Sequence, residues 1–242
     1  MTAAPKRAIV LAAGLGLRLR PITEQLPKPL IEVAGRALID RALDRLAEAG
    51  VESAVVNTHY LGEKIEKHLS RRQRPAISFS PEKVLLETGG GVMQALGRLG
   101  GGPFYVVNSD IAWVDGPEPA LARLAQSWDD ARMDALLLVN AKARSPDYDG
   151  RGDFFLTPGM RLRRRKRDES APYVFTGLQI LHPRLFAGAK PGRFSLNLLY
   201  DRAEAAKRLY AVAHDGHWFH IGTPDGLALA QRELPRIEQA AR

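Results

Sequence analysis

The chain has 242 residues, 45% of them hydrophobic, which is enough to bury the core of one large α/β domain or two small ones. It contains no cysteine, which excludes disulfide bonds, thiol chemistry and thiolate metal sites and fits a cytoplasmic protein. No stretch approaches the roughly 18 to 20 apolar residues of a membrane span, and the apolar run at residues 8–13 is too short for a signal peptide.

The net charge of +8 is concentrated in two basic runs. One spans residues 161–167, and the other contains Arg71, Arg72 and Arg74. A basic chain suggests nucleic acid, acidic lipid or anionic small molecules as partners. Neither run is interleaved with aromatic residues, which argues against a platform that stacks nucleic-acid bases. We therefore expect solvated faces, with no nucleic-acid or membrane partner.

The most informative stretch lies near the start of the chain. Ala8–Ala13 predicts a buried parallel strand, and a glycine turn follows at Gly14–Gly16. Glycines let a polyphosphate approach backbone N–H groups, and Arg18 and Lys28 would supply positive charge. Taken alone, the turn slightly favours a structural role. The dinucleotide fingerprint would need glycine in place of Leu19, and the Walker A pattern is absent.

The following segments alternate between helical and strand patterns, which favours an α/β fold. Asn57 and His59 follow the second expected strand, at the end of a strand where ligands bind in open α/β sheets. A lone histidine at such a position is more often structural. The expected helices are residues 36–50, 62–69, 92–99 and 118–128, and the expected strands are residues 51–57, 77–79, 103–107 and 135–139.

Two features in this part of the chain suggest a ligand site. The three glycines at Gly89–Gly91 cost backbone entropy, so we expect their backbone to lie flat against a nucleotide base or ribose, or against the sheet. Asp110 follows the strand at 103–107. A carboxylate at that end of a strand, beside a phosphate cradle, is well placed to hold Mg²⁺. The alternative for Asp110 is a simple turn or helix cap.

The rest of the chain predicts a more antiparallel group of strands and a helical end. Thr176 and Gly177 interrupt the last of these strands, as a site of close backbone approach would. No internal repeat or flexible linker divides the sequence, so we expect a single domain over residues 1–242. The expected strands are residues 154–156, 161–165 and 173–181, and the expected helices are residues 184–187, 195–207 and 224–240.

Several motifs occur together in a fixed order, over roughly residues 6–232: LAAGLGLRLRPIT, PKPL, ETGGG, NSD, FTG and HWFHIGT. This series resembles the sugar-1-phosphate nucleotidylyltransferases, which make nucleotide sugars. Within them, the SPE and GRGDF segments look most like the N-acetylmuramate-1-phosphate uridylyltransferases. The resemblance implies a Rossmann-like three-layer α/β/α fold with a mostly parallel sheet and a small antiparallel sugar-binding insert. It also implies a nucleotide-binding half at about residues 1–115 and a sugar-binding half at about residues 116–242.

The resemblance implies that UTP and N-acetylmuramic acid 1-phosphate are the partners and that UDP-N-acetylmuramic acid and pyrophosphate are the products. The implied catalytic residues are Arg18, Lys28 and Asp110, with Asp110 as the ligand of Mg²⁺ or alternatively Mn²⁺. The implied nucleotide-binding residues are Ala12, Ala13, Gly14, Leu15, Gly16, Leu17, Glu82, Thr88, Gly89 and Gly90. The implied sugar-binding residues are Asn108, Gly150, Asp153, Thr176 and Gly177.

Two departures from the family pattern affect these expectations. His220 stands where the family commonly has an aspartate that is a second metal ligand, and imidazole is a poor ligand for Mg²⁺. We favour a metal held by Asp110, water and phosphates over a softer ion on His220 or a weakened site. The Glu-Lys-Pro of thymidylyltransferase relatives is absent, which argues against that activity. It also leaves open which cation holds the sugar phosphate, with Arg165 or Lys166 as candidates.

Two alternatives stay open at this stage. The first keeps the chemistry and changes the substrates, as in a mannose-1-phosphate guanylyltransferase or another sugar-phosphate nucleotidylyltransferase. The second is a nucleotide-sugar-binding regulator without catalysis, which His220 keeps open and the intact Arg18, Lys28 and Asp110 oppose. The oligomeric state is open, and a monomer is compatible with the sequence.

Overall fold

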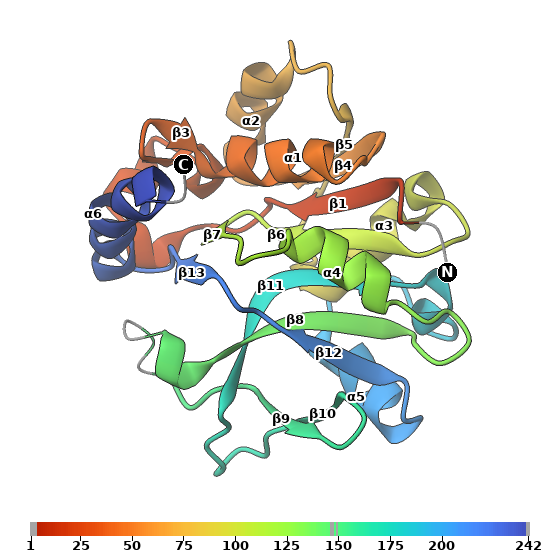
Figure 1. Cartoon of the computed structure of the whole chain (residues 1–242). Coiled ribbons are helices and arrows are strands. Elements are labelled where there is room, and N and C mark those ends of the chain that lie inside the picture. Colours follow the sequence, from red (N-terminus) through yellow and green to blue (C-terminus); the bar gives the residue numbers. More distant parts are fainter. Residues whose placement is uncertain (1–3, 146–147, 149, 241–242) are drawn as a thin grey trace.

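The computed structural model describes residues 4–145, 148 and 150–240, which form a layered α/β structure (Figure 1). Within these residues, nine strands make one sheet whose order is β5-β4-β1-β6-β11-β8-β12-β10-β9. In that order the strands are β5 (Ala76–Pro81), β4 (Ser53–Thr58), β1 (Arg7–Leu11), β6 (Phe104–Asn108), β11 (Tyr173–Leu181), β8 (Ala135–Ala141), β12 (Leu209–Ala213), β10 (Arg161–Arg164) and β9 (Phe154–Thr157).

The first four strands in this order are parallel, as their continuous apolar runs predicted. Ile9 of β1 is in register with Val55 of β4 and Val106 of β6, and all three side chains are buried. Leu11 and Asn108 are likewise paired at the carboxyl ends of β1 and β6. The segments that follow these strands therefore begin side by side, which is where ligands bind in open α/β sheets.

Strand β11 lies at the centre of the sheet, antiparallel to both β6 and β8. The sequence pattern had grouped it with the antiparallel insert. Its near-continuous burial explains the central place, because a strand covered on both faces cannot form an exposed edge. The register shifts between Phe175 and Gln179, around Gly177 with a φ of 89°. Strands β9 and β10 do form an antiparallel pair at the edge.

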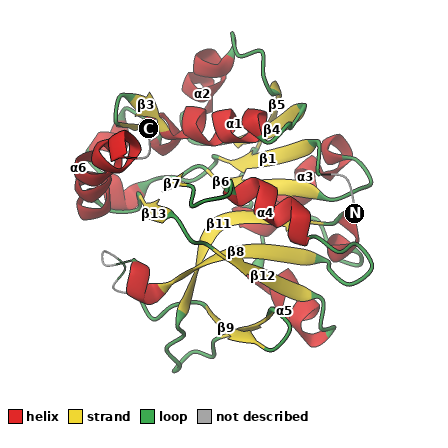
Figure 2. Ribbon diagram, in the orientation of Figure 1, coloured by secondary structure: helices red, strands yellow, loops and turns green. Residues whose placement is uncertain are grey.

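Helices cover both faces of the sheet, which confirms the three-layer fold (Figure 2). One face packs against α1 (Leu38–Glu48), α2 (Gly62–Leu69) and α4 (Ala120–Ser127) through Leu43, Ile65 and Leu124. The other packs against α3 (Glu87–Leu99) and α5 (Asn197–Ala205) through Val92 and Leu199. Among the described helices, none is both long and apolar enough to cross a membrane.

A third cluster of buried side chains lies beyond the sheet and joins the loop that follows β1 to the C-terminal segment. It forms beneath α6 (Pro224–Ala240), which lies beside the N-terminal segment in Figure 1. Leu19, Phe219 and Leu234 are among its buried members. The cluster fixes the N-terminal loop against the end of β13, and so positions parts of the candidate site. Its members come partly from three short strands: β2 (Glu32–Val33), β7 (Ile111–Val114) and β13 (His217–His220). Strand β2 pairs with β3 (Arg36–Ala37), and the sequence pattern predicted none of β2, β3 and β7.

Short 3-10 turns complete the fold. The first three follow β1 and carry most of the N-terminal motif, and the last replaces the helix expected at residues 184–187. They span Leu17–Leu19, Ile22–Glu24, Lys28–Leu30, Lys142–Arg144 and Pro183–Phe186.

Candidate active site

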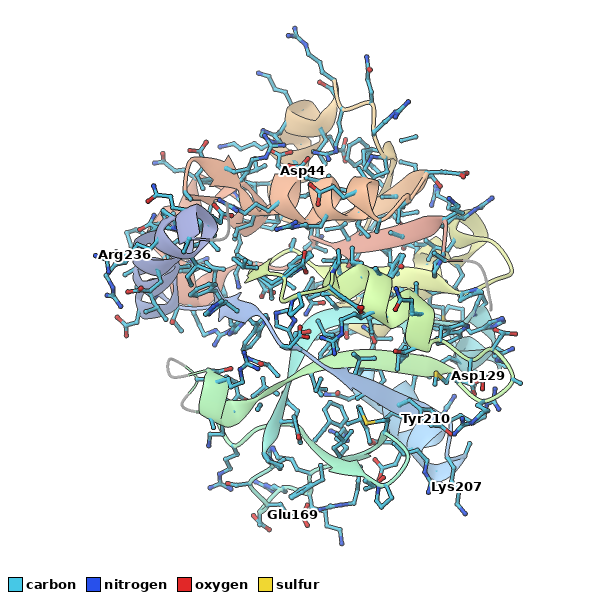
Figure 3. All side chains as sticks on the ribbon, viewed as in Figure 1. Asp44, Asp129, Glu169, Lys207, Tyr210 and Arg236 are labelled. Atoms are coloured by element: carbon cyan, nitrogen blue, oxygen red, sulfur yellow. The ribbon has the colours of Figure 1, made fainter. Side chains whose placement is uncertain are left out.

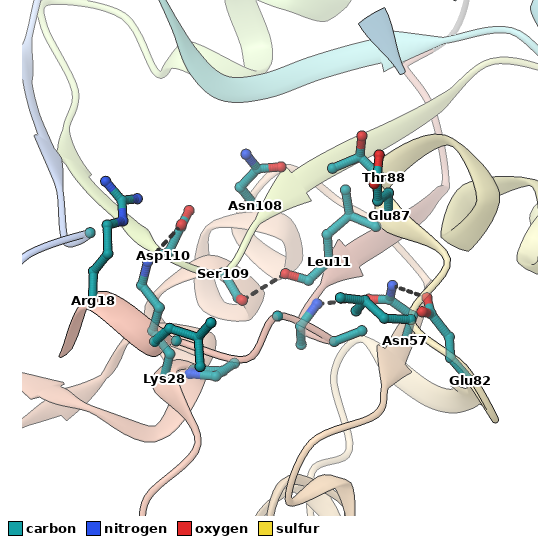
Figure 4. A pocket seen from close by; sticks show the side chains of 18 of the residues that line it. Leu11, Arg18, Lys28, Asn57, Glu82, Glu87, Thr88, Asn108, Ser109 and Asp110 are labelled. Carbon is teal, nitrogen blue, oxygen red and sulfur yellow. Dashed lines mark hydrogen bonds and ion pairs between the residues drawn. The ribbon is translucent and has the colours of Figure 1, made fainter. Parts of the chain in front are cut away.

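A cavity of about 560 Å³ opens at the carboxyl ends of β1, β4 and β6 (Figure 4). It brings together most of the residues that the sequence placed at the nucleotide. The expected residues that line it are Ala12, Ala13, Gly14, Gly16, Leu17, Arg18, Lys28, Glu82, Thr88, Asn108 and Asp110. Its other lining residues are Leu11, Pro29, Asn57, Leu85, Glu87, Ser109, Ser195 and Gly222.

One end of this cavity, here called the cationic end, contains Arg18, Lys28 and Asp110. Lys28 Nζ donates a hydrogen bond to Asp110 Oδ2 at 2.8 Å, although the two residues are 82 positions apart. His220 Nε2 lies 3.7 Å from the same oxygen. Burial alone would raise the pKa of the Asp110 carboxyl, but the nearby His220 and the charge of Lys28 hold it well below its usual range. Asp110 is therefore an ionised carboxylate at neutral pH.

The glycine turn at the cationic end is fixed from behind and open toward the cavity. Gly16 has a φ of 64°, and a Cβ built on it would lie 2.9 Å from Thr23 Cγ2. Thr23 Oγ1 donates to the Gly16 carbonyl at 2.8 Å and is itself buried. A Cβ built on Gly14 would meet nothing within 4 Å. The turn therefore has a rigid base and free space on its exposed side, as a backbone cradle for an anion needs.

Gly222 allows the C-terminal motif to reach the cationic end. A Cβ built there would lie 2.4 Å from His220 Cε1 and 3.0 Å from Arg18 Nη2. The His220 ring stacks on Trp218, with centroids 6.2 Å apart and planes 4° from parallel. Trp218 Nε1 in turn donates to the Thr176 carbonyl at 2.8 Å. His220 is thus held in place by an aromatic side chain that is anchored to the central strand β11.

The opposite end of the cavity, here called the Glu82 end, is a buried hydrogen-bond network (Figure 4). Asn57 Oδ1 accepts from the Ala12 N–H at 2.7 Å, and Asn57 Nδ2 donates to Glu82 Oε1 at 2.7 Å. Glu82 Oε2 accepts from the Leu86 N–H at 2.8 Å. This chain of bonds fixes the orientation of both side chains. Glu82 and Asn57 are only 5% and 2% exposed, so the network is rigid and largely dry.

The triple glycine lies inside α3, where each glycine makes room for another part of the chain. A Cβ on Gly89 would lie 2.4 Å from the Phe194 ring, and one on Gly90 would lie 2.2 Å from the Gly192 carbonyl. The N–H groups of Gly89 and Gly90 both donate to the Phe194 carbonyl. Gly89 and Gly90 do not line the cavity, and neither does Leu15, whereas Thr88 at the start of α3 does. Glycine is needed at positions 89 and 90 because α3 packs closely against the loop that precedes α5.

The residues expected to bind the sugar lie in several different environments. Asn108 lines the cavity and packs against Gly177, whose built Cβ would lie 3.0 Å from Asn108 Cβ. Thr176 is fully buried and its Oγ1 donates to the Leu138 carbonyl at 2.8 Å. Asp153 accepts from the Phe175 N–H at 2.9 Å and lines a second cavity. Gly150 packs against the Tyr148 ring. None of Gly150, Asp153, Thr176 and Gly177 lines the main cavity.

Comparison with known proteins agrees with this geometry. The sequence matches the family described as "Nucleotidyl transferase" over residues 7–148. The chain belongs to the nucleotidyl transferase family. It is 44% identical to the N-acetylmuramate alpha-1-phosphate uridylyltransferase of Caulobacter vibrioides, over 97% of this chain and 99% of that protein. It is 37% identical to the Neisseria meningitidis protein of the same name, over 93% and 96% of the two chains.

Solved structures support the same fold. A UDP-glucose pyrophosphorylase in complex with UDP-glucose superposes with a TM-score of 0.77 at 20% identity, covering 96% of this chain and 98% of that one. At this identity the likeness shows the fold alone. The Rossmann-like architecture expected from the sequence is therefore confirmed.

The side chains in this cavity of the nucleotidyl transferase suit a metal ion that is bound partly by the protein and partly by the substrate. Among the described residues, no group of three or more His, Asp or Glu side chains is close enough to hold a metal on protein ligands alone. Asp110 offers one ionised carboxylate inside the cavity, with only Oδ2 engaged by Lys28 and His220. Mg²⁺ is commonly held by one or two carboxylates together with substrate phosphates and water. Asp110 fits that pattern, whereas the imidazole of His220 does not.

Several lining residues were not predicted as site residues from the sequence. The sequence pointed to Asn57 only because it lies at the end of an expected strand. Nothing in the sequence indicated that its side-chain amide would bond to Glu82. Ser109 belongs to a recognised motif, and its Oγ donates to the Leu11 carbonyl at 2.6 Å, joining β1 to the segment after β6. Ser195 and Leu85 lie on loops without a regular pattern. Ser195 and Leu85 reach the cavity only through the tertiary fold, which no local sequence pattern predicts.

Proposed function

We propose that this chain transfers the uridylyl group of UTP to N-acetylmuramic acid 1-phosphate, giving UDP-N-acetylmuramic acid and pyrophosphate. The observation that carries the proposal is the pairing of Lys28 with Asp110 beside the open glycine turn, in a chain 44% identical over nearly its whole length to a protein with this name. This pairing supports phosphoryl-group chemistry in particular, since it sets a mobile cation and a metal-binding carboxylate against one anion-binding loop.

In this reaction an oxygen of the sugar phosphate attacks the α-phosphorus of UTP in line, and pyrophosphate leaves. The protein needs no covalent intermediate, so positioning and charge neutralisation supply most of the rate enhancement. The backbone of Gly14–Leu17 and the Arg18 guanidinium would hold the β- and γ-phosphates. Lys28, whose side chain is 12% exposed, would stabilise the charge that develops on the α-phosphate. The largely buried setting strengthens that interaction.

We propose Mg²⁺ as the metal, with Asp110 as its protein ligand. When bound, the ion would supply positive charge that neutralises part of the charge on the phosphates. His220 would act on Asp110 and not on the ion, because its Nε2 already lies near the carboxylate oxygen that Lys28 binds. When the metal and UTP bind, Lys28 is free to turn from Asp110 to the phosphates, since a lysine ammonium is mobile.

The Glu82 end would hold the base and ribose. The Glu82 carboxylate accepts hydrogen bonds only, and the N3–H of uracil is a donor that it could engage. Thr88 would contact the nucleotide from the start of α3. Asn108, Gly150, Asp153, Thr176 and Gly177 remain the proposed sugar-binding residues, of which Asn108 lies nearest the phosphates because it lines the same cavity. The product is a nucleotide sugar of cell-wall recycling, formed from cytoplasmic UTP.

The test is a panel of nucleoside triphosphates against several sugar 1-phosphates, with pyrophosphate release as the measurement. UTP with N-acetylmuramic acid 1-phosphate should give the highest kcat/KM. Turnover with GTP and mannose 1-phosphate in place of this pair would replace the proposal by guanylyl transfer. Tight nucleotide binding with no turnover in Mg²⁺ or Mn²⁺ would replace it by a regulatory role.

A further inference from the structure

A second cavity, of about 1,050 Å³, lies between β10 and α5 and shares no lining residue with the main cavity. Two segments of the chain contribute to the surroundings of both cavities. Ser195 lines the main cavity and Asn197 the second one. Phe175 lines the second cavity, and Gly177, two positions further along β11, packs against Asn108 of the main cavity. A sugar that occupies both cavities would run along these two segments.

One wall of the second cavity consists of five consecutive basic residues, and two of these are paired. Arg163 Nη1 lies 2.7 Å from Glu169 Oε2, and Glu169 is labelled near the edge of the molecule in Figure 3. Arg164 binds the Asp201 carboxylate with two nitrogens, at 2.6 and 2.7 Å. These two arginines have a structural explanation, because each ties β10 to a neighbouring segment through a carboxylate.

The other three basic residues of this wall are Arg165, Lys166 and Arg167. The Arg165 guanidinium donates to the carbonyls of Gly152, Lys166 and Arg167, which hold its position but do not neutralise its charge. Among the described residues, no carboxylate forms an ion pair with the side chains of Lys166 or Arg167, which are both exposed. Within the described part of the chain, none of these three side chains is in an ion pair, although the charge of Arg165 interacts with that of Asp153 in the same cavity.

The rest of the second cavity is suited to a sugar. Phe154, Phe175 and Tyr200 line it, with the Tyr200 ring edge-to-face to the other two rings. Phe154 and Tyr200 are buried in the core, whereas Phe175 is only partly buried and can offer apolar surface to a sugar ring.

Asp153 uses Oδ2 to accept from the Phe175 N–H, which leaves Oδ1 for a hydroxyl or amide donor. The carboxylates of Asp201 and Glu204 also line the cavity, but both accept hydrogen bonds from Arg164. An apolar surface, a free acceptor on Asp153 and cations outside ion pairs together suit a sugar that carries an anionic substituent.

We infer that Arg165, Lys166 and Arg167 bind a carboxylate on the acceptor sugar and so select acidic acceptors over neutral ones. The inference rests on the proposed function, since the ether-linked lactate of N-acetylmuramic acid is such a carboxylate. The 1-phosphate of the acceptor is not the group bound here. It must reach the α-phosphate of UTP at the cationic end, beside Lys28 and Asp110, and neither of these residues lines the second cavity.

The experiment compares two acceptors that differ only in the lactyl ether, N-acetylmuramic acid 1-phosphate and N-acetylglucosamine 1-phosphate. Their affinities are measured by calorimetry in the presence of Mg²⁺ and a non-hydrolysable UTP analogue, for the wild type and for Lys166→Gln/Arg167→Gln. Both substituted side chains are exposed, so the fold should persist. The matched control is Arg161→Gln, on the strand β10 that precedes this turn and outside the cavity.

The double variant should weaken binding of N-acetylmuramic acid 1-phosphate by about 10-fold to 100-fold, as expected for loss of charge-assisted hydrogen bonds. Binding of N-acetylglucosamine 1-phosphate should not change, and Arg161→Gln should alter neither affinity. Equal losses for both acceptors would overturn the inference in favour of phosphate binding. Unchanged affinities would overturn it in favour of a solvated basic face.

The same measurements separate this inference from the proposed function. A wild type that turns over N-acetylmuramic acid 1-phosphate with UTP, but whose affinity for it survives the double substitution, would overturn the inference alone. A wild type that uses another nucleotide and a neutral sugar phosphate would overturn the proposed function, and the carboxylate site with it.

Discussion

The two ends of the main cavity are built on different principles. At the Glu82 end, the Asn57 amide accepts from the Ala12 N–H and donates to the Glu82 carboxylate, which also accepts from the Leu86 N–H. The Asn57 and Glu82 side chains are buried. At the cationic end, the Asp110 and His220 side chains are 28% and 34% exposed. Lys28 and His220 both lie next to the Asp110 carboxylate, so these polar groups contact one another and do not anchor core backbone groups. The first end therefore contributes to the fold through its buried bonds, whereas the second retains charged groups that the fold does not need.

Substitution of Lys28 should give the largest functional effect. It is the strongest test of whether the cationic end serves activity and not stability. Lys28→Ala should lower kcat by about 100-fold to 1,000-fold, because it removes a preorganised charge from the reacting phosphate. The urea midpoint should change little, since Asp110 keeps His220 and water as partners. Turnover assays and urea unfolding monitored by circular dichroism check both parts. A near-normal kcat would exclude Lys28 from catalysis.

At the opposite end, Asn57→Ala should cost both stability and substrate affinity. The change leaves the Ala12 N–H and one Glu82 oxygen without their buried partner, which costs about 1 to 3 kcal/mol of unfolding free energy. The KM for UTP should rise because Glu82 is no longer held in one orientation. Urea unfolding and initial rates test this pair of effects. Loss of activity at full stability would show that the two ends do not differ as described.

The two glycine segments offer a matched pair of substitutions. Gly90→Ala should destabilise the protein by about 1 to 3 kcal/mol, because overpacking forces α3 away from the loop at Gly192. Gly14→Ala should leave stability nearly unchanged, since its Cβ would meet nothing within 4 Å. Thermal melts of both variants give the answer. Equal stability losses would mean that the turn after β1 is also packed and is not open to a ligand.

The smallest expected effect concerns Asp153 and its dependence on pH. Burial raises the pKa of Asp153 above its unfolded value, although Arg165 and Arg164 partly oppose the shift. The ionised carboxyl therefore costs folding free energy at neutral pH, and this cost disappears as the pH falls through the raised pKa. Asp153→Asn should be slightly more stable than the wild type at pH 7, with no difference in acid. An advantage that grows in acid would reverse the sign and contradict this account.

The parallel half of the fold was predictable because its signal is local. The strand at residues 8–13 and the strand before Asp110 are continuous apolar runs, and their ends carry the motif residues. The central place of β11 was not predictable, because its pattern describes a buried strand without naming its neighbours. Pairing with both β6 and β8 is a property of the whole sheet.

The site was predictable to the extent that its residues belong to ordered motifs. Lys28 and Asp110 were both expected at the phosphates, and the structure brings them into contact. The surroundings of Gly89 and Gly90 were not predictable, because Phe194 and Gly192 lie about a hundred residues later on an irregular loop. Whether the charges at residues 165–167 are paired likewise depends on which carboxylates the fold brings nearby, and sequence alone had favoured a solvated run.

The most direct test of the central claim follows the phosphorus atoms of UTP during turnover with N-acetylmuramic acid 1-phosphate and Mg²⁺. UTP labelled in the α-phosphate should transfer its label to UDP-N-acetylmuramic acid, and UTP labelled in the γ-phosphate should release its label as pyrophosphate at the same rate. Transfer of the γ-label to the sugar, or no transfer of the α-label while nucleotide still binds, would contradict attack on the α-phosphorus at the cationic end.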